Sequence, residues 1–283
     1  MTLAAWQDQS SRGGRAAWSG GPPPVNANCD WAADYGRELK AIIHRQADRA
    51  PRSVQVHVGP SELGAPCSRQ VVGKMIGPGL APHTNHVGSP WPAIIGTATH
   101  AWLAQALEDE NARTGVGRFL AEMRVAPVPE HPGTADGYDR SAGILLDWKV
   151  VGPTTLAKIA SPSGPSRRYK VQLLLYWLGC LIAGLDVRRI ALVALPRTAP
   201  SLDQMYVWGC TPGPEEIALL QDVLRVTAVR RQIAAEILKG NMRLADVPIT
   251  PDEQECWFCP QWRPQSFYDG GPGCPGKTGG SGP

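Results

Sequence analysis

Apolar residues recur at helical spacing in some parts of the chain and alternate with polar residues in others. Helical spacing predicts helices at residues 28–50, from 60 through Cys67, and at 94–112, 153–159, 167–183 and 214–239. Alternation predicts strands at residues 54–58, 122–128, 134–138, 143–150, 189–195 and 205–209. Three of these strands follow one another across short turns, which is typical of an antiparallel meander. The pattern predicts an α/β fold, a central mixed sheet flanked by helices.

Composition along the chain predicts the domain organisation. Residues 1–27 are rich in Gly, Pro and Ser and predict a flexible N-terminal segment. Residues 28–246 hold the predicted helices and strands and predict one core domain with a helical N-terminal part. Residues 247–283 predict an irregular, cysteine-bearing C-terminal tail that is disordered at its end.

Length and charge limit the classes of function. A chain of 283 residues can bury one sizeable core. With a formal net charge of only +3 it has no basic tail for coating nucleic acid, so any such contact depends on a local patch. No apolar run reaches the roughly 18 residues that cross a bilayer, and there is no signal-peptide core. We therefore expect a cytoplasmic protein without membrane contact.

Asp147 and Lys149 are the first candidates for chemistry, because they lie two apart on a predicted strand. Side chains alternate between the two faces of a strand, so this carboxylate and this ammonium share one face. Asp136 on the preceding strand can lie across from them and complete a set of oxygen ligands for Mg²⁺ or Mn²⁺. Such an ion activates water and screens charge on a phosphate. A surface Asp and Lys in an ordinary hairpin is the alternative.

His100 lies on a predicted helix face with Leu103 and Leu107, a stripe that should pack on the sheet. The small residues Gly96 and Ala104 leave space beside the imidazole, through which it could reach a metal held on the sheet. An imidazole ligand favours manganese over magnesium. A histidine satisfied within the core is the alternative.

Arg168, Gln172 and Tyr176 share one face of the predicted helix at 167–183. Hydrogen-bond donors and an aromatic ring in one stripe are suited to binding a nucleic-acid strand. A partly solvated polar face is the alternative interpretation.

Four motifs follow one another between residues 60 and 200: Gly96-x-x-x-His100, Gly133-x-x-Asp136, Asp147-x-Lys149 and Gln172-x-x-x-Tyr176. In this order they resemble the RecB-type nucleases of the PD-(D/E)xK superfamily, which have a restriction-endonuclease-like core. The resemblance implies that Lys149 is the catalytic lysine and that Gln172 and Tyr176 position the substrate. It also implies metal ligation by His100, Asp136, Asp147 and the carbonyl of Trp148.

Seven cysteines in a reducing compartment indicate ligands or buried thiols rather than disulfides. The candidate ligands are Cys67, Cys256, Cys259 and Cys274. Four thiolates fit an iron–sulfur cluster or a structural zinc. One cysteine before the nuclease motifs and three after them resembles the iron–sulfur nucleases of the CRISPR-associated Cas-four type and the AddB-type exonucleases. That resemblance implies a [4Fe-4S] cluster that holds the tail on the core.

Two features of the sequence leave the set of cysteine ligands open. The gap between Cys259 and Cys274 is longer than in those families, and Cys29 is the reserve ligand. Cys180 and Cys210 are expected to be small buried residues.

These features together predict a metal-dependent DNA exonuclease that hydrolyses phosphodiester bonds in single-stranded DNA or at DNA ends. A non-catalytic, zinc-stapled nucleic-acid-binding protein is the second hypothesis, and a structural or partner-docking protein is the third. The chain has no Walker-type phosphate loop, so a helicase motor or recombination function would have to come from a partner. Free-standing proteins of the resembled type are often phage-encoded. Polarity and oligomeric state are left open.

Overall fold

The structure is a computed structural model that describes residues 30–50, 57–81, 89–252, 255–256, 259–262, 267–268, 271–272 and 274–276. It divides into two compact units, Met1–Gln46 and Ala47–Pro283. The first unit contains most of helix α1 (Asp30–Asp48), whose apolar stripe from Trp31 to Ile43 is exposed. The flexible segment predicted at 1–27 lies outside the described residues, and the boundaries predicted at 28 and 247 stay predictions.

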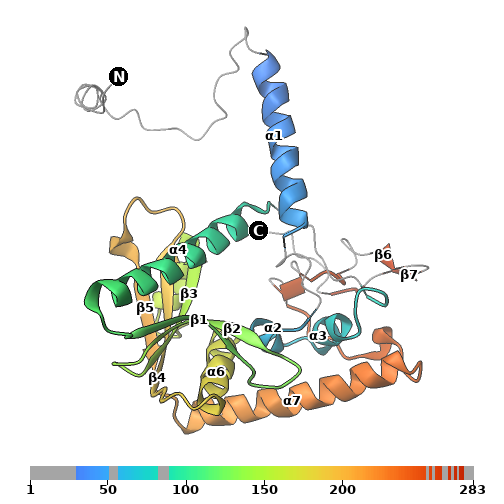
Figure 1. Cartoon of the computed structure of the whole chain (residues 1–283). Coiled ribbons are helices and arrows are strands. Elements are labelled where there is room, and N and C mark those ends of the chain that lie inside the picture. Colours follow the sequence, from blue (N-terminus) through green and yellow to red (C-terminus); the bar gives the residue numbers. More distant parts are fainter. Residues whose placement is uncertain are drawn as a thin grey trace. The chain divides into compact units, whose positions relative to one another are not determined.

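The second unit is built on a five-stranded sheet with the order β1-β2-β3-β4-β5 (Figure 1). The strands are β1 (Phe119–Val125), β2 (Gly133–Asp139), β3 (Ile144–Val151), β4 (Arg189–Pro196) and β5 (Tyr206–Cys210). The first three form the predicted antiparallel meander, β4 runs parallel to β3, and β5 is antiparallel to β4. A parallel neighbour needs a crossover, and α5 (Pro153–Ala160) and α6 (Arg167–Ile182) provide it. The α/β prediction is therefore confirmed.

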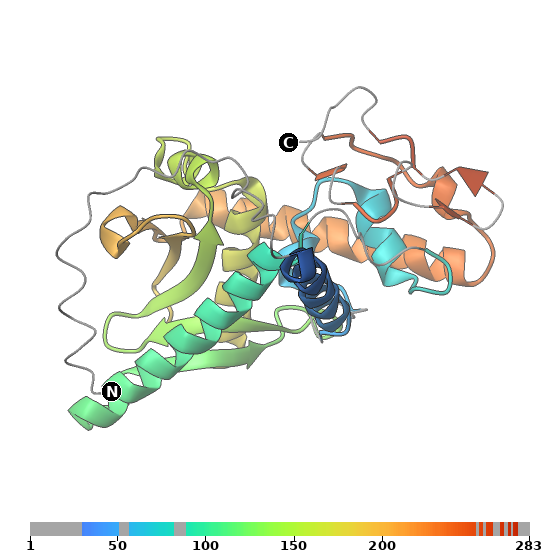
Figure 2. The ribbon, with the colours of Figure 1, turned by 90° about the horizontal axis from the view of Figure 1, so that it is seen from above.

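Helices cover both faces of the sheet, as Figures 1 and 2 show. On one face α6 contributes Leu173, Leu174 and Leu175 to the main core, together with Leu145 of β3. On the other face lies α4 (Trp91–Thr114), whose Leu103 and Leu107 pack against Trp148 of β3. Alternate residues of β3 thus face opposite helices, as its pattern predicts.

A smaller core joins α3 (Ser68–Met75) to α7 (Pro214–Leu238) and to the start of the tail. Its buried members are Val72, Ile76, Ala81, Ala234 and Val247. After α7 the described residues include the 3₁₀ helix η4 (Leu244–Asp246) and the paired short strands β6 (Phe267–Tyr268) and β7 (Gly271–Pro272). The 3₁₀ helix η3 (Leu202–Gln204) precedes β5. This core fixes the start of the tail against α3.

The single helix predicted from Pro60 through Cys67 is wrong. The chain forms a short helix α2 (Pro60–Leu63), breaks at Gly64, and starts α3 after Cys67, which takes the N-cap position. Gly64 approaches α6 so closely that an added Cβ would lie 2.9 Å from Cβ of Val171. The break therefore lets the chain pass close to α6 and leaves Cys67 at the start of a helix.

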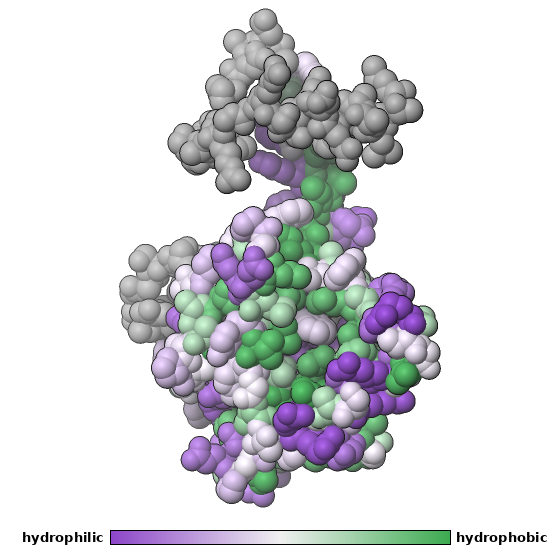
Figure 3. Space-filling view, turned by 90° about the vertical axis from the view of Figure 1, so that its left-hand side faces the viewer, coloured by the Kyte–Doolittle hydropathy of each residue, from purple (hydrophilic) through white to green (hydrophobic). Residues whose placement is uncertain are grey.

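The surface of the second unit mixes apolar and polar residues. Figure 3 shows hydrophobic side chains lying between hydrophilic ones on one face. Exposed large apolar residues include Trp91 and Trp102 of α4, and Leu202 and Val207 near β5. Within the described part of the chain, no helix combines the length and apolar character needed to cross a membrane.

Candidate functional site

Asp136 lies where the pairing of β2 with β3 ends. The ladder stops at Gly137 opposite Leu146, and the backbone N–H of Trp148 then donates to Oδ2 of Asp136 at 2.7 Å. A side chain thus takes over a bond that the neighbouring strand would otherwise supply. The strands separate there, and the carboxylate of Asp136, only 8% exposed, occupies the opening.

Asp147 and Lys149 lie together on β3, as predicted. Asp147 is 1% exposed, and its Oδ1 accepts a hydrogen bond of 2.9 Å from Nε2 of Gln172. Nζ of Lys149 lies 2.5 Å from Oδ2, which makes an ion pair, although this oxygen receives no directed hydrogen bond from any described residue. Burial raises the pKa of Asp147, and the ammonium of Lys149 opposes that shift while the negative charge of Asp136 adds to it.

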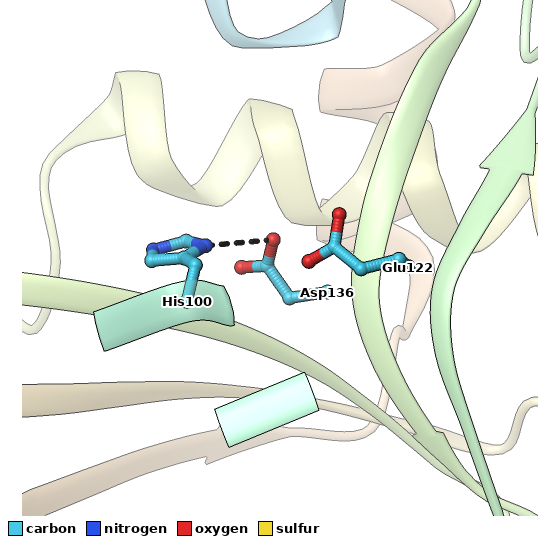
Figure 4. Close-up of side chains that lie close together, drawn as sticks. All are labelled: His100, Glu122 and Asp136. Atoms are coloured by element: carbon cyan, nitrogen blue, oxygen red, sulfur yellow. Dashed lines mark ion pairs between the residues drawn. The ribbon is translucent and has the colours of Figure 1, made fainter. Parts of the chain in front are cut away.

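His100 and Glu122 place two further candidate metal ligands beside Asp136 (Figure 4). Nδ1 of His100 lies 3.2 Å from Oδ1 of Asp136. The pairs on either side, Ala121 with Gly137 and Met123 with Ala135, place Glu122 opposite Asp136 on β1. One ligand atom from each of His100, Glu122 and Asp136 lies within 4.8 Å of the other two. This spacing suits one divalent ion bound between them.

Glu122 was not predicted, although it begins the strand-like run at 122–128. Its backbone φ is +48°, a left-handed conformation that costs a non-glycine residue about 1–2 kcal/mol. Such strain persists where the surrounding structure imposes it, and here it sits beside the candidate ligands. A carboxylate on the strand next to Asp136 was the available signal, but only the pairing register shows that the two face each other.

A Cβ added at Gly96 would meet no atom within 4 Å, whereas space beside the imidazole of His100 stays a prediction. Asp147 is not part of the group within 4.8 Å, but His100 and Asp136 are near enough to influence its pKa. Trp148 packs its side chain under α4 and donates its N–H to Asp136. Ligation by its carbonyl and by Asp147 stays a prediction.

The three predicted substrate residues on α6 have different surroundings. Gln172 and Tyr176 are buried, at 8% and 7% exposure, so the partly solvated face does not form. Gln172 holds Asp147, and Arg168 donates to the carbonyl of Ser61 at 2.9 Å and to Glu255 of the tail at 2.8 Å. Their roles toward substrate stay predictions, while their described contacts are with the candidate site and with the tail.

The four candidate thiols line one pocket between α3 and the tail. Cys67, Cys256, Cys259 and Cys274 all contribute to its wall. Burial raises the pKa of Cys259 to about 12, and the other three cysteines add to the shift. The backbone N–H of Cys274 donates to the carbonyl of Gln261 at 2.7 Å, which brings the distant cysteine back to the Cys-x-x-Cys pair. The long spacer before Cys274 therefore does not keep it from the site.

The remaining cysteines lie elsewhere. Cys180 is fully buried in the main core, where burial raises its pKa to about 11. Cys210 is half-buried on β5, and Cys29 lies outside the described residues.

Comparison with solved structures finds an alkaline exonuclease from Laribacter hongkongensis. The identity is 12%, the match covers 65% of this chain and 93% of that chain, and the TM-score is 0.44. The same exonuclease in complex with dAMP matches at 13% identity over the same shares, with a TM-score of 0.43. No protein-family model matches the chain, and no curated protein does. Scores of this size leave the function to be inferred from the geometry of the two sites.

Proposed function

We propose that this protein is a metal-dependent DNA exonuclease of the RecB type that hydrolyses phosphodiester bonds. The observation that supports it best is the convergence of His100, Glu122 and Asp136 beside the buried pair Asp147 and Lys149. Carboxylates with one imidazole suit Mn²⁺ or Mg²⁺. When bound, such an ion supplies positive charge that lowers the pKa of a water ligand and neutralises charge on phosphate.

The residues of the chain have separate roles in this proposal. Asp136, His100 and Glu122 would hold the ion, and Asp147 would add a further carboxylate ligand. Lys149 keeps its ammonium beside Asp147, from which it can orient the attacking water and stabilise the charge that develops on the phosphoryl oxygens. Gln172 fixes the orientation of Asp147 through its 2.9 Å hydrogen bond, so it acts as a positioning residue.

We further propose that the four thiols hold a [4Fe-4S] cluster, with zinc as the other metal that the donors suit. The pocket joins Cys67, at the start of α3, to a tail that is more than 180 residues away in the sequence. Such a centre would close this long loop and fix the tail beside Arg168 and α6. Its proposed role is structural, and it takes no part in phosphodiester hydrolysis.

Lys149→Ala tests the proposed activity. The expected result is loss of cleavage of single-stranded DNA with binding nearly unchanged, because the ammonium acts on the developing charge rather than on ground-state affinity. Lys158→Ala, which removes an exposed lysine of α5, is the matched control and should cleave normally. Undiminished cleavage by Lys149→Ala would sink the assignment. Chelation of divalent ions should abolish wild-type cleavage.

A further inference from the structure

Arg230 of α7 is a buried cation with neutral hydrogen-bond partners. It is 4% exposed, and its guanidinium donates to three carbonyls, those of Leu63 at 3.1 Å, Ala65 at 2.9 Å and Pro66 at 3.2 Å. A fourth bond of 3.2 Å goes to the hydroxyl of Ser68. Among the described residues, no carboxylate pairs with it. Burying a charge without an opposite charge is costly, so the position of Arg230 needs an explanation.

The partners of Arg230 surround Cys67. Leu63, Ala65, Pro66 and Ser68 form the turn between α2 and α3 that carries this cysteine into the thiol pocket. Burial lowers the pKa of Arg230 and the nearby cation Arg167 adds to that, whereas Cys67 acts in the opposite direction. A negative charge on Cys67 would therefore favour the charged guanidinium of Arg230.

Arg69 approaches the same pocket from α3. Its Nη1 donates to Sγ of Cys274 at 3.8 Å, while Nε and Nη2 donate to the carbonyls of Val247 at 2.9 Å and Ala245 at 2.6 Å. The carboxylate that lines the pocket, Glu255, is paired with Arg168. Two guanidinium groups thus flank the thiols, one beside Cys67 and the other beside Cys274.

The charge of the proposed centre explains this arrangement. Four thiolates around Zn²⁺ carry a net charge of about −2, and four thiolates around a [4Fe-4S]²⁺ core carry the same charge. Four protonated thiols carry no charge, and both guanidinium groups would then have only neutral hydrogen-bond partners. We propose that Arg69 and Arg230 are the counter-charges of a doubly negative thiolate–metal centre, and that they retain it in the pocket. This proposal rests on the thiol centre put forward above and is independent of nuclease activity.

Retention of metal by Arg69 variants tests the proposal. Protein is purified anaerobically, its iron and zinc are measured, and the bound metal is challenged with a chelator while loss is followed over time. Arg69→Gln should lose metal about tenfold faster than wild type, since an outer partner of a ligand is worth about 10–100-fold. Arg69→Lys keeps the charge without the fork of donors and should stay within about threefold of wild type.

Arg113→Gln is the control, because Arg113 is an exposed arginine of α4 that pairs with Glu110. It should retain metal like wild type. Arg230→Gln should lose metal as Arg69→Gln does, and circular dichroism and gel filtration report whether it folds. If it does not fold, the comparison of Arg69→Gln with Arg69→Lys still tests the proposal.

Two results would overturn the proposal. If Arg69→Gln holds metal as long as wild type, the counter-charge is unnecessary. If Arg69→Lys loses metal as fast as Arg69→Gln, Arg69 acts through its hydrogen bonds to the tail and not through its charge. Wild-type protein without iron or zinc would refute the thiol centre itself, whereas the cleavage assay tests the nuclease separately.

Discussion

The sheet site and the thiol site differ in the sign of the charge that surrounds them. On the sheet, the site has three carboxylates, those of Glu122, Asp136 and Asp147, and one ammonium, that of Lys149, so the excess charge is negative. Around the thiols, the guanidinium groups of Arg69 and Arg230 make the excess positive. The first arrangement attracts a bare divalent cation, and the second attracts a metal centre whose thiolates make it an anion.

The two sites also differ in how the chain assembles them. The sheet site draws on α4, β1, β2 and β3, which are consecutive elements of the sheet and of the helix that packs on it. The thiol site joins the start of α3 to residues 256–274, across the whole sheet domain in sequence. A catalytic site needs rigid elements, whereas a site that joins distant segments contributes mainly to stability.

Removal of a sheet carboxylate should give the largest effect on activity. Asp147→Asn takes a charge from the proposed ion and from Lys149, and we expect DNA cleavage to fall by about a thousandfold or more. Iron or zinc content should be unchanged. Asp186→Asn, at an exposed aspartate, is the control for end-labelled DNA assays. A variant that loses both cleavage and tail metal would show that the two sites are not separate.

Removal of a thiol should reduce metal content and stability rather than act directly on the catalytic site. Cys256→Ser is expected to lose the tail metal and to lower the melting temperature by at least about 10 °C, because metal binding is coupled to folding. Cys210→Ser, at a half-buried cysteine outside the pocket, should keep its metal. Calorimetry and metal analysis measure both effects. Unchanged melting with full loss of metal would contradict the structural role.

Glu122→Gln should have an intermediate effect on the sheet site. Loss of one proposed ligand is expected to weaken Mn²⁺ binding about tenfold or more by titration calorimetry. Glu122→Asn removes the charge with a residue that tolerates the left-handed backbone, so the backbone strain at this position should fall by up to about 1 kcal/mol. Mn²⁺ affinity equal to wild type in both variants would exclude Glu122 from the ligand set.

The sequence predicts those parts of the sheet site that depend on the periodicity of a single strand or helix. It does not predict those that depend on how neighbouring strands pair. The shared face of Asp147 and Lys149 follows from strand alternation and is found as predicted. The burial of Gln172 and Tyr176 was not predicted. A polar face of a helix is expected to be solvated, but at these two residues the rest of the protein also covers the polar face of α6. Glu122 was missed because opposition across strands depends on register, which the sequence alone does not show.

The thiol site was predictable as a group of residue types but not in its surroundings. Cys-x-x-Cys spacing drew attention to the tail, and the structure brings Cys67 and Cys274 to the same pocket. Nothing in the sequence linked Arg230 to the residues next to Cys67, since Arg230 and Cys67 are 163 residues apart and Arg230 reaches that turn only because α7 packs on α3. Contacts of this kind depend on tertiary packing rather than on local pattern.

Substitution of Asp139 should have the smallest effect, and it affects stability rather than metal binding. Asp139 lies on the same strand as Asp136, so it also serves as a control for that residue. Arg118 donates to its carboxylate at 2.5 Å, and this bond, with others from Ser141 and Ala142, lowers the pKa of Asp139 to about 2. Because that pKa is lower in the folded chain, the network stabilises the protein above about pH 4 and loses its contribution as the pH falls toward 2. Arg118 is half exposed, so Asp139→Asn should cost about 1–2 kcal/mol at pH 7.

Urea unfolding at pH 7 and pH 3 measures this difference. Asp139→Asn should bind Mn²⁺ like wild type, whereas Asp136→Asn should lose Mn²⁺ without a comparable loss of stability. Equal losses of Mn²⁺ binding in the two variants would show that β2 acts through the fold rather than through its ligands.

Cleavage of end-labelled single-stranded DNA by wild-type protein and by Lys149→Ala, with Mn²⁺ or Mg²⁺ or a chelator, tests the nuclease proposal most directly. The sheet site predicts that wild type releases labelled mononucleotides or short fragments only when a divalent ion is present, and that Lys149→Ala releases none. No cleavage by folded wild-type protein with either ion, or equal cleavage by Lys149→Ala, would contradict it.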